Sequence, residues 1–305
     1  MNRRTFLHSA GLTVAAGWGG MAACRSGAAG TGTAGAGAAA STAGSAAGAL
    51  PPLRSVGLQL STVRALLDKD IAGTFRQIAD IGYRTVELSA DFYEKRKPAD
   101  VRALLDAHGL SSPVGLYRDD TIRDDTAGVA RAARTIGQRY VGLPSLSASS
   151  RVSRESYRQA AGRFNEWGRR LKDEGLMLTY HNHAFEFETL GGDSPAFDIL
   201  LRETDPELVA FELDLYWIDK AGHDPVAYFE RFPGRFALFH LKDSTPAPAK
   251  AFAPVGAGVM DFRRILSYAE RAGMRHAFVE HDKPDNPIAS IRTSYANLAR
   301  LLPRG

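Results

Sequence analysis

Histidines and carboxylates stand at the ends of several apolar segments in the second half of the chain. The segment YHNHAFEF, residues 180–187, follows the apolar run LMLT and contains His181, His183 and Glu186. Histidine beside aspartate or glutamate is the usual ligand chemistry of a divalent metal such as Mn²⁺, Mg²⁺ or Zn²⁺. Three later apolar segments end in similar residues: first Asp214, then His240, Lys242 and Asp243, and finally Glu280, His281 and Asp282.

Each of these residues also has an ordinary structural interpretation. A single histidine at a strand end is more often a hydrogen-bonded group than a metal ligand. Asp214 suits the cap of a turn, and Glu280 suits an ion pair with Arg275 or Lys283. The metal interpretation therefore depends on whether the fold brings these segment ends together.

Short apolar runs alternate with longer segments of helical spacing along the folded part of the chain. In residues 71–82, apolar residues recur at Ile71, Phe75 and Ile78, and Gly82 follows as a helix-ending glycine. Such alternation predicts parallel strands covered by helices, and eight repeats of this length predict a (β/α)8 TIM barrel. No GxGxxG follows the first run, which argues against a dinucleotide-binding fold. The predicted strands are residues 54–60, 84–89, 111–117, 139–144, 176–182, 208–215, 235–243 and 275–282.

A TIM barrel gathers the C-terminal ends of its strands around one mouth, where its active site lies. The segment ends described above would meet there, and the first two strands would add Gln59 and Glu87. Unpaired charges at such a mouth are costly to bury, so they need partners or a cation. Because alternate residues of a strand share a face, the pairs in phase are His181 with His183, Glu212 with Asp214, and His240 with Lys242.

The first fifty residues differ in composition from the rest. Residues 1–24 have the layout of an export signal, with Arg3 and Arg4 resembling the twin-arginine signal of proteins exported in folded form. Cys24, the only cysteine, excludes an internal disulfide. It stands where a lipoprotein signal would place an acylated cysteine, so we weigh membrane anchoring through lipidated Cys24 against a chance cysteine. Residues 25–52 are Gly/Ala/Ser-rich and predict a flexible linker.

Residues 53–305 form the predicted barrel domain, which carries little net charge. The whole chain has a formal net charge of +4, but its first 52 residues contain three arginines and no acidic residue. Removing these three leaves +1 on the barrel domain. This balance argues against a nucleic acid as partner.

Six segments together resemble the sugar phosphate isomerase/epimerase family of xylose isomerase-like TIM barrels. The resemblance covers residues 54–300, and its motifs are VGLQLSTVR, YHNHAFEF, FELDLYWIDKAGHDP, PGRFALFHLKD, VGAGVMDF and VEHD. It implies one divalent cation held at the ends of strands five to eight by Glu, Asp, His and Glu. Asp214, His240 and Glu280 match the last three ligands, and His181 stands in place of the first glutamate. Three arrangements stay open for the first ligand position: His181 binds the metal there, or Glu186 reaches back and binds it, or the metal is held by three protein groups and water.

The resemblance also implies a metal-dependent isomerase, epimerase or dehydratase that removes a proton next to a carbonyl. An exported protein meets few sugar phosphates, and no glycine-rich helix start has a basic residue nearby. The expected partner is therefore a small unphosphorylated carbohydrate: a sugar, polyol or keto-glycoside. Two alternatives are a non-catalytic exported sugar-binding barrel and a metal-dependent hydrolase or endonuclease of the same superfamily, and the oligomeric state stays open.

Each site residue has an expected role in such a reaction. His183 is expected to act as the acid/base catalyst, and Glu280 to bind the metal and take part in proton transfer. Lys242 and Glu87 are expected to orient hydroxyls or stabilise charge, and Gln59 and Glu186 to bind the sugar.

Overall fold

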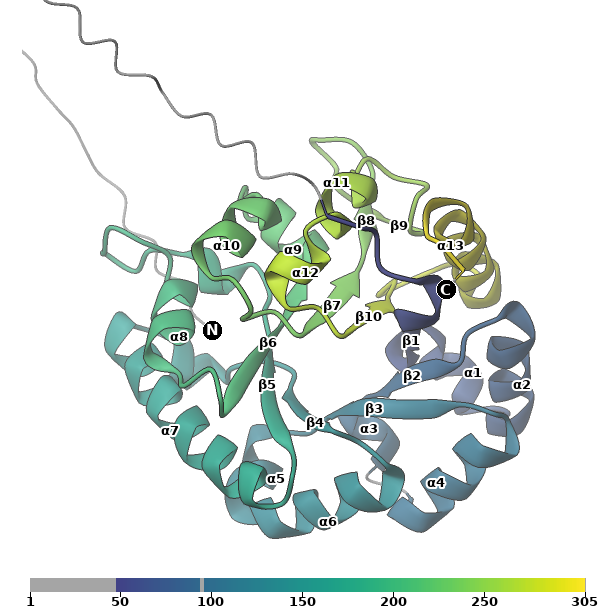
Figure 1. Ribbon diagram of the computed structural model, residues 1–305, viewed down its shortest axis with the longest axis horizontal. Coiled ribbons are helices and arrows are strands. Elements are labelled where there is room, and N and C mark those ends of the chain that lie inside the picture. Colours follow the sequence, from purple (N-terminus) through teal and green to yellow (C-terminus); the bar gives the residue numbers. More distant parts are fainter. Residues whose placement is uncertain (1–47, 94–95, 305) are drawn as a thin grey trace, which may run out of the picture. The chain divides into compact units, whose positions relative to one another are not determined.

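The computed structural model describes residues 48–93 and 96–304. The predicted export signal, Cys24 and residues 25–47 of the predicted linker lie outside the described residues. Eight parallel strands close into a barrel, which confirms the predicted fold class (Figure 1). The barrel strands are β1 Val56–Gln59, β2 Thr85–Leu88, β3 Ser111–Leu116, β4 Tyr140–Leu143, β5 Met177–His181, β6 Val209–Asp214, β7 Leu238–Leu241 and β10 His276–Val279.

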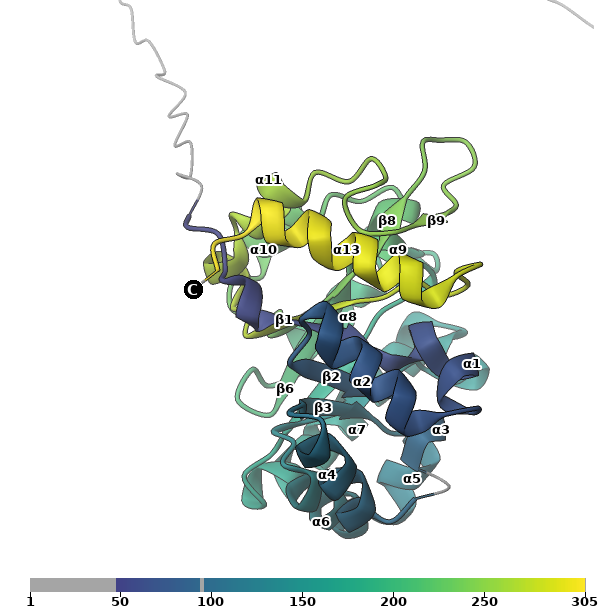
Figure 2. The same cartoon turned by 90° about the vertical axis from the view of Figure 1, so that its right-hand side faces the viewer.

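Helices surround the barrel, and Figure 2 shows α13, α2 and α4 following one another along its outer surface. Two short helices, α11 and α12, lie between the last hairpin and β10, and the helices α1, α3, α5 and α9 are likewise short. None of the described helices is both long and apolar enough to cross a membrane. The helices are α1 Arg64–Leu67, α2 Ile71–Ile81, α3 Ala90–Tyr93, α4 Pro98–Ala107, α5 Asp119–Asp124, α6 Thr126–Ile136, α7 Arg154–Asp173, α8 Phe197–Glu203, α9 Leu215–Lys220, α10 Pro225–Arg231, α11 Phe262–Leu266, α12 Ala269–Ala272 and α13 Pro287–Leu301.

Helix α2 illustrates how the local sequence sets these elements. The Asp70 side chain accepts a hydrogen bond from the Gly73 N–H and so caps the first turn. Phe75 and Ile78 are buried on the side that packs against the core. The helix ends at Gly82, whose φ of +125° is a conformation that side chains other than glycine rarely adopt.

The interior of the barrel changes from apolar to charged along its strands. Val114, Ala210, Leu238 and Phe278 belong to one buried apolar cluster. Alternate residues of a strand share a face, so the inward positions that follow on the same strands lie closer to their C-terminal ends. Along β6, β7 and β10 these positions are Glu212 and Asp214, then His240 and Lys242, and then Glu280. The apolar layer therefore supports a charged layer at the C-terminal mouth.

The segment after β7 forms a small hairpin, β8 Asp243–Ser244 with β9 Phe252–Ala253, and then a glycine loop at residues 255–260. The buried Asp243 carboxylate accepts hydrogen bonds from four backbone N–H groups, those of residues 244, 256, 258 and 260, at 2.8–3.1 Å. The glycine loop therefore wraps around an internal carboxylate. This arrangement fixes the backbone directly after Lys242.

Candidate metal centre

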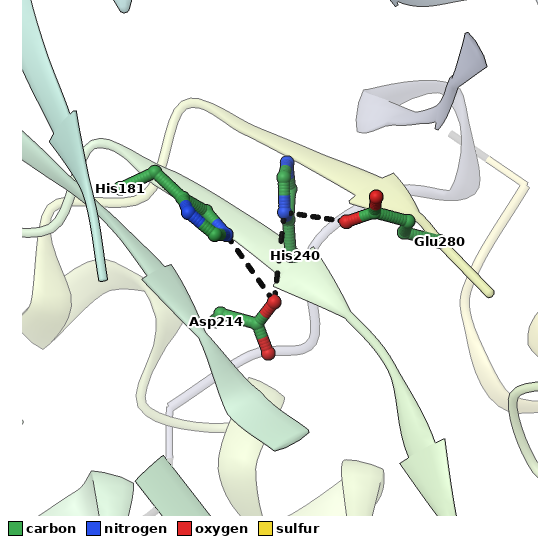
Figure 3. A group of neighbouring side chains, drawn as sticks. All are labelled: His181, Asp214, His240 and Glu280. Atoms are coloured by element: carbon green, nitrogen blue, oxygen red, sulfur yellow. Dashed lines mark hydrogen bonds and ion pairs between the residues drawn. The ribbon is translucent and has the colours of Figure 1, made fainter. Parts of the chain in front are cut away.

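Side chains from four adjacent strands meet at the barrel mouth (Figure 3). The Nε2 atom of His181 lies 3.3 Å from the Oδ2 atom of Asp214. The Nδ1 atom of His240 lies 3.7 Å from the same Oδ2 atom and 2.9 Å from the Oε2 atom of Glu280. All four side chains are buried. We call His181, Asp214, His240 and Glu280 the candidate metal centre, and these four are the ligands proposed from the sequence.

The donor atoms of the candidate metal centre fit a divalent ion. Ligands about 2.1 Å from a tetrahedral ion lie about 3.4 Å from one another, close to the separations observed. His240 Nδ1 and Glu280 Oε2 are buried and lack a hydrogen-bond partner of suitable geometry, although they lie 2.9 Å apart. Burial opposes protonation of His240, but Glu212, Glu87 and Glu280 outweigh it and raise its pKa well above the usual value. The centre therefore attracts a cation.

His181 is oriented so that one ring nitrogen faces the centre. Its Nδ1 atom lies 3.1 Å from the backbone oxygen of Pro144. A carbonyl oxygen only accepts, so Nδ1 carries a proton, and Nε2 is the ring nitrogen that faces Asp214 and would bind an ion when it is unprotonated. Metal-binding histidines are usually held by such a second hydrogen bond. Of the three arrangements left open by the sequence, this geometry favours His181 as a ligand.

Glu186 lies apart from the centre, in a short 3₁₀ helix at Phe185–Phe187. Its carboxylate is fully buried and accepts hydrogen bonds from the Tyr180 hydroxyl at 2.5 Å and from the His183 N–H at 2.8 Å. Both carboxylate oxygens are therefore occupied within the protein. The structure places Glu186 where it holds the backbone of His183 and outside the candidate metal centre, and its expected sugar contact stays a prediction.

Lys242 lies against the candidate metal centre and shares two of its oxygens. Its Nζ atom is 3.0 Å from Asp214 Oδ2, 2.9 Å from Glu280 Oε2 and 3.1 Å from Asp282 Oδ1. Burial opposes the charge of Lys242, but these carboxylates raise its pKa above the usual value. The ammonium in turn holds the pKa of Asp214 well below its usual value, against the effect of burial.

His183 and Trp217 present unpartnered polar atoms beside the centre. The His183 ring lies 4.9 Å from that of His181 and 5.6 Å from that of Trp217, measured between centroids. Among residues 48–93 and 96–304, neither His183 Nδ1 nor Trp217 Nε1, both buried, has a hydrogen-bond partner. Burial, with a contribution from His181, lowers the pKa of His183 to about 3, so its imidazole is neutral at pH 7. Trp217 was not predicted as a site residue, although Asp214 caps α9 and thereby holds Trp217 in the first turn.

Residues on the first two strands contact other residues of the site, and the sequence did not indicate these contacts. Gln59 is almost fully buried, and its side-chain oxygen accepts a hydrogen bond from the Ser61 N–H at 2.9 Å. The Ser61 hydroxyl, which was not predicted, donates to Glu280 Oε1 at 2.5 Å. Glu87 is fully buried, with Oε2 2.5 Å from His240 Nε2. Gln59 and Glu87 therefore support other site residues, whereas the sequence suggested direct contact with substrate.

Comparison with known proteins agrees with this fold. Residues 75–301 match the family described as xylose isomerase-like TIM barrel. The chain belongs to this family. This chain is similar to an inosose dehydratase of Lacticaseibacillus casei, with 25% identity over 122 residues. That match covers 35% of this chain and 40% of the dehydratase, so it spans less than half of the relative.

Two solved structures show the same fold at lower sequence identity. A sugar phosphate isomerase/epimerase from Parabacteroides distasonis is 22% identical with a TM-score of 0.70, covering 81% of this chain and 99% of that one. The IolI protein, whose crystal structure contains a zinc atom, is 14% identical with a TM-score of 0.62, covering 81% of this chain and 98% of that one. These similarities show the fold and do not identify the reaction.

Proposed function

We propose that this protein is a divalent-metal-dependent enzyme that removes a proton next to the carbonyl of an unphosphorylated sugar, polyol or keto-glycoside. Isomerisation, epimerisation or dehydration then follows according to the substrate. The observation that carries the proposal is the candidate metal centre itself, with Lys242 and His183 beside it at the mouth of the barrel. The inosose dehydratase relatives and the zinc atom of the IolI protein support the same chemistry.

A bound divalent ion would supply positive charge that stabilises the negative charge developing on a carbonyl oxygen. His181, Asp214, His240 and Glu280 would hold it. Two imidazoles and two carboxylates suit Zn²⁺ or Mn²⁺, and Mg²⁺ less well because that ion prefers oxygen ligands. These four side chains are buried, so the charge acts where water screens it little.

The chain provides its own groups for proton transfer and substrate orientation. The neutral His183 imidazole has a free Nδ1 atom to accept a proton. The Trp217 indole N–H has no hydrogen-bond partner among the residues that the structure describes and is suited to donate to a substrate hydroxyl. The Lys242 ammonium remains charged at neutral pH and is placed to stabilise an oxyanion.

The glycine loop supports an unphosphorylated substrate. Backbone N–H groups in such loops commonly bind phosphate. Here three N–H groups of the loop, those of residues 256, 258 and 260, already donate to the Asp243 carboxylate. A phosphate at this loop would meet that carboxylate and be repelled by it.

Hydrogen exchange next to the carbonyl tests the proposal most sharply. Protein stripped of metal and then reloaded is incubated in D₂O with a panel of ketoses, cyclic polyol ketones and keto-glycosides, and deuterium uptake is followed by NMR. We expect uptake that requires metal and that falls about a hundredfold or more in His183→Asn, with metal still bound. A substrate that binds without exchange or turnover would instead favour a non-catalytic sugar-binding barrel.

We also propose export through the twin arginines and lipid attachment at Cys24, on the sequence pattern alone. Replacing Arg3 and Arg4 by Lys should retain the protein in the cytoplasm. Mass spectrometry of the exported form should find an acylated N-terminal Cys24. Cleavage at another position, or an unmodified cysteine, would contradict the lipid anchor.

A further inference from the structure

A second group of buried ionisable side chains lies behind the candidate metal centre. Glu87 on β2 and Glu212 on β6 are both fully buried. Glu87 Oε2 lies 2.5 Å from His240 Nε2, and Glu212 Oε1 lies 3.3 Å from the same nitrogen. The opposite ring nitrogen, Nδ1, belongs to the candidate metal centre. Two carboxylates therefore face one edge of the imidazole, and the metal ligands face the other.

These two carboxylates form few other interactions among the described residues. Within the described part of the chain, both oxygens of Glu212 and the Oε1 atom of Glu87 are buried without a hydrogen bond. Burying carboxylate oxygens without hydrogen bonds destabilises a fold. A pair of them on one histidine nitrogen therefore points to a role that the fold alone does not require.

We propose that Glu87 and Glu212 are positioning residues that hold the Nε2–H of His240 and turn its Nδ1 lone pair toward the metal. A carboxylate behind a ligating histidine fixes its tautomer and ring orientation and strengthens its donation to the ion. The inference rests on the proposed metal centre and adds a specific device for it. Glu212 contributes mainly negative charge, and Glu87 contributes the close hydrogen-bond acceptor.

The proposal predicts opposite effects on metal affinity and on the stability of the metal-free protein. Glu212→Gln removes a buried carboxylate that forms no hydrogen bond and repels Glu87, and Glu87 still pairs with His240, so the metal-free melting temperature should stay the same or rise. The same change weakens metal binding about tenfold or more. Glu87→Leu should weaken binding similarly, whereas Glu87→Gln keeps an acceptor oxygen and should restore part of the affinity.

Asp198→Asn provides the matched control. Asp198 on α8 is also buried, but it pairs with Arg231 and Arg202 and does not belong to either group of candidate ligands. Losing this charge should lower the melting temperature and leave metal affinity unchanged. The control therefore separates loss of a buried carboxylate from loss of a carboxylate behind His240.

The experiment titrates metal-free protein and each variant with Zn²⁺ and Mn²⁺ against a chromophoric chelator, with melting curves recorded in EDTA. Weaker binding in Glu212→Gln and Glu87→Leu, with unchanged or higher metal-free melting temperatures, supports the inference. Unchanged affinity in both variants overturns it. Two ions per wild-type chain, one of them lost in Glu212→Gln, also overturns it and makes Glu87, Glu212 and His240 a second ion site. A wild-type protein that binds neither metal refutes the metal centre itself, which distinguishes the failure of the proposed function from the failure of this inference.

Discussion

Lys242→Met should destabilise the metal-free protein and strengthen metal binding. The Lys242 ammonium contacts Asp214 Oδ2 and Glu280 Oε2, two oxygens that belong to the candidate metal centre. Without the ion, this lysine compensates two buried carboxylates. With the ion bound, it is a like charge close to the metal. The side chain therefore acts in opposite directions in the two states.

The size of each effect follows from burial. Lys242 is 3% exposed, so its loss leaves uncompensated charge in the interior. Breaking a buried ion pair in this way costs about 3–5 kcal/mol of unfolding free energy in the metal-free protein. In the metal-bound protein the ion takes over this compensation. Removing the like charge should tighten metal binding by at least about tenfold, or about 1.4 kcal/mol. The difference in unfolding free energy between Lys242→Met and wild type should therefore be smaller with metal than without it, by that amount or more.

Urea unfolding in EDTA and in saturating Mn²⁺ measures both quantities. Lys172→Met is the matched control, because the Lys172–Glu207 pair lies on the surface with its side chains 50% and 77% exposed. The control should lose no more than about 1 kcal/mol, independently of metal. If Lys242→Met loses the same unfolding free energy with and without metal, or binds metal more weakly than wild type, Lys242 does not act against the ion in this way.

Two further predictions concern the elements that support the site. Gly258→Ala places a Cβ atom in overlap with Asp243 Oδ1 and the Ser244 carbonyl oxygen, so thermal unfolding should show that the unfolding free energy falls by about 1–3 kcal/mol. Gly162→Ala in α7 is the control: its Cβ meets open space, and the unfolding free energy should rise by about 0.5–1 kcal/mol. Equal effects of the two substitutions would contradict the packing of the glycine loop. Burial raises the pKa of Glu186 from 4.5 to about 7, against the effect of the Tyr180 hydroxyl, so the folded state holds this proton more tightly than the unfolded state and loses stability as pH rises from 4.5 to 7. The unfolding free energy of wild type minus that of Glu186→Gln should therefore fall by about 3 kcal/mol over this range, and a difference that does not change with pH would show that Glu186 is not buried in this way.

The barrel and the grouping of the four residues of the candidate metal centre are predictable because both depend on short-range patterns. The predicted strand at residues 176–182 is an apolar run with His181 near its end, and three later runs carry the other three residues near their ends. Parallel strands in a closed barrel bring such ends together without further information. The glycine after α2 likewise marks a helix end from its residue type alone.

The supporting contacts depend on the register between distant strands, which local patterns do not contain. Glu212 was recognised only as in phase with Asp214, and its approach to Glu87 and His240 depends on the stagger around the barrel. Ser61 reaches Glu280 across 219 residues of sequence. Glu87 was expected to contact the substrate, because the sequence places it on a strand and does not show that His240 lies against its carboxylate.

The centre itself is tested most directly by the metal content of Asp214→Asn. Asparagine keeps the side-chain oxygen that caps α9 and removes the carboxylate charge from the centre. Asp224→Asn is the control, because Asp224 caps α10 in the same manner at a partly exposed position away from the centre. After dialysis against a fixed low concentration of free Mn²⁺ or Zn²⁺, elemental analysis should find one ion per chain in wild type and in Asp224→Asn, and little in Asp214→Asn. Full occupancy in Asp214→Asn would contradict the account.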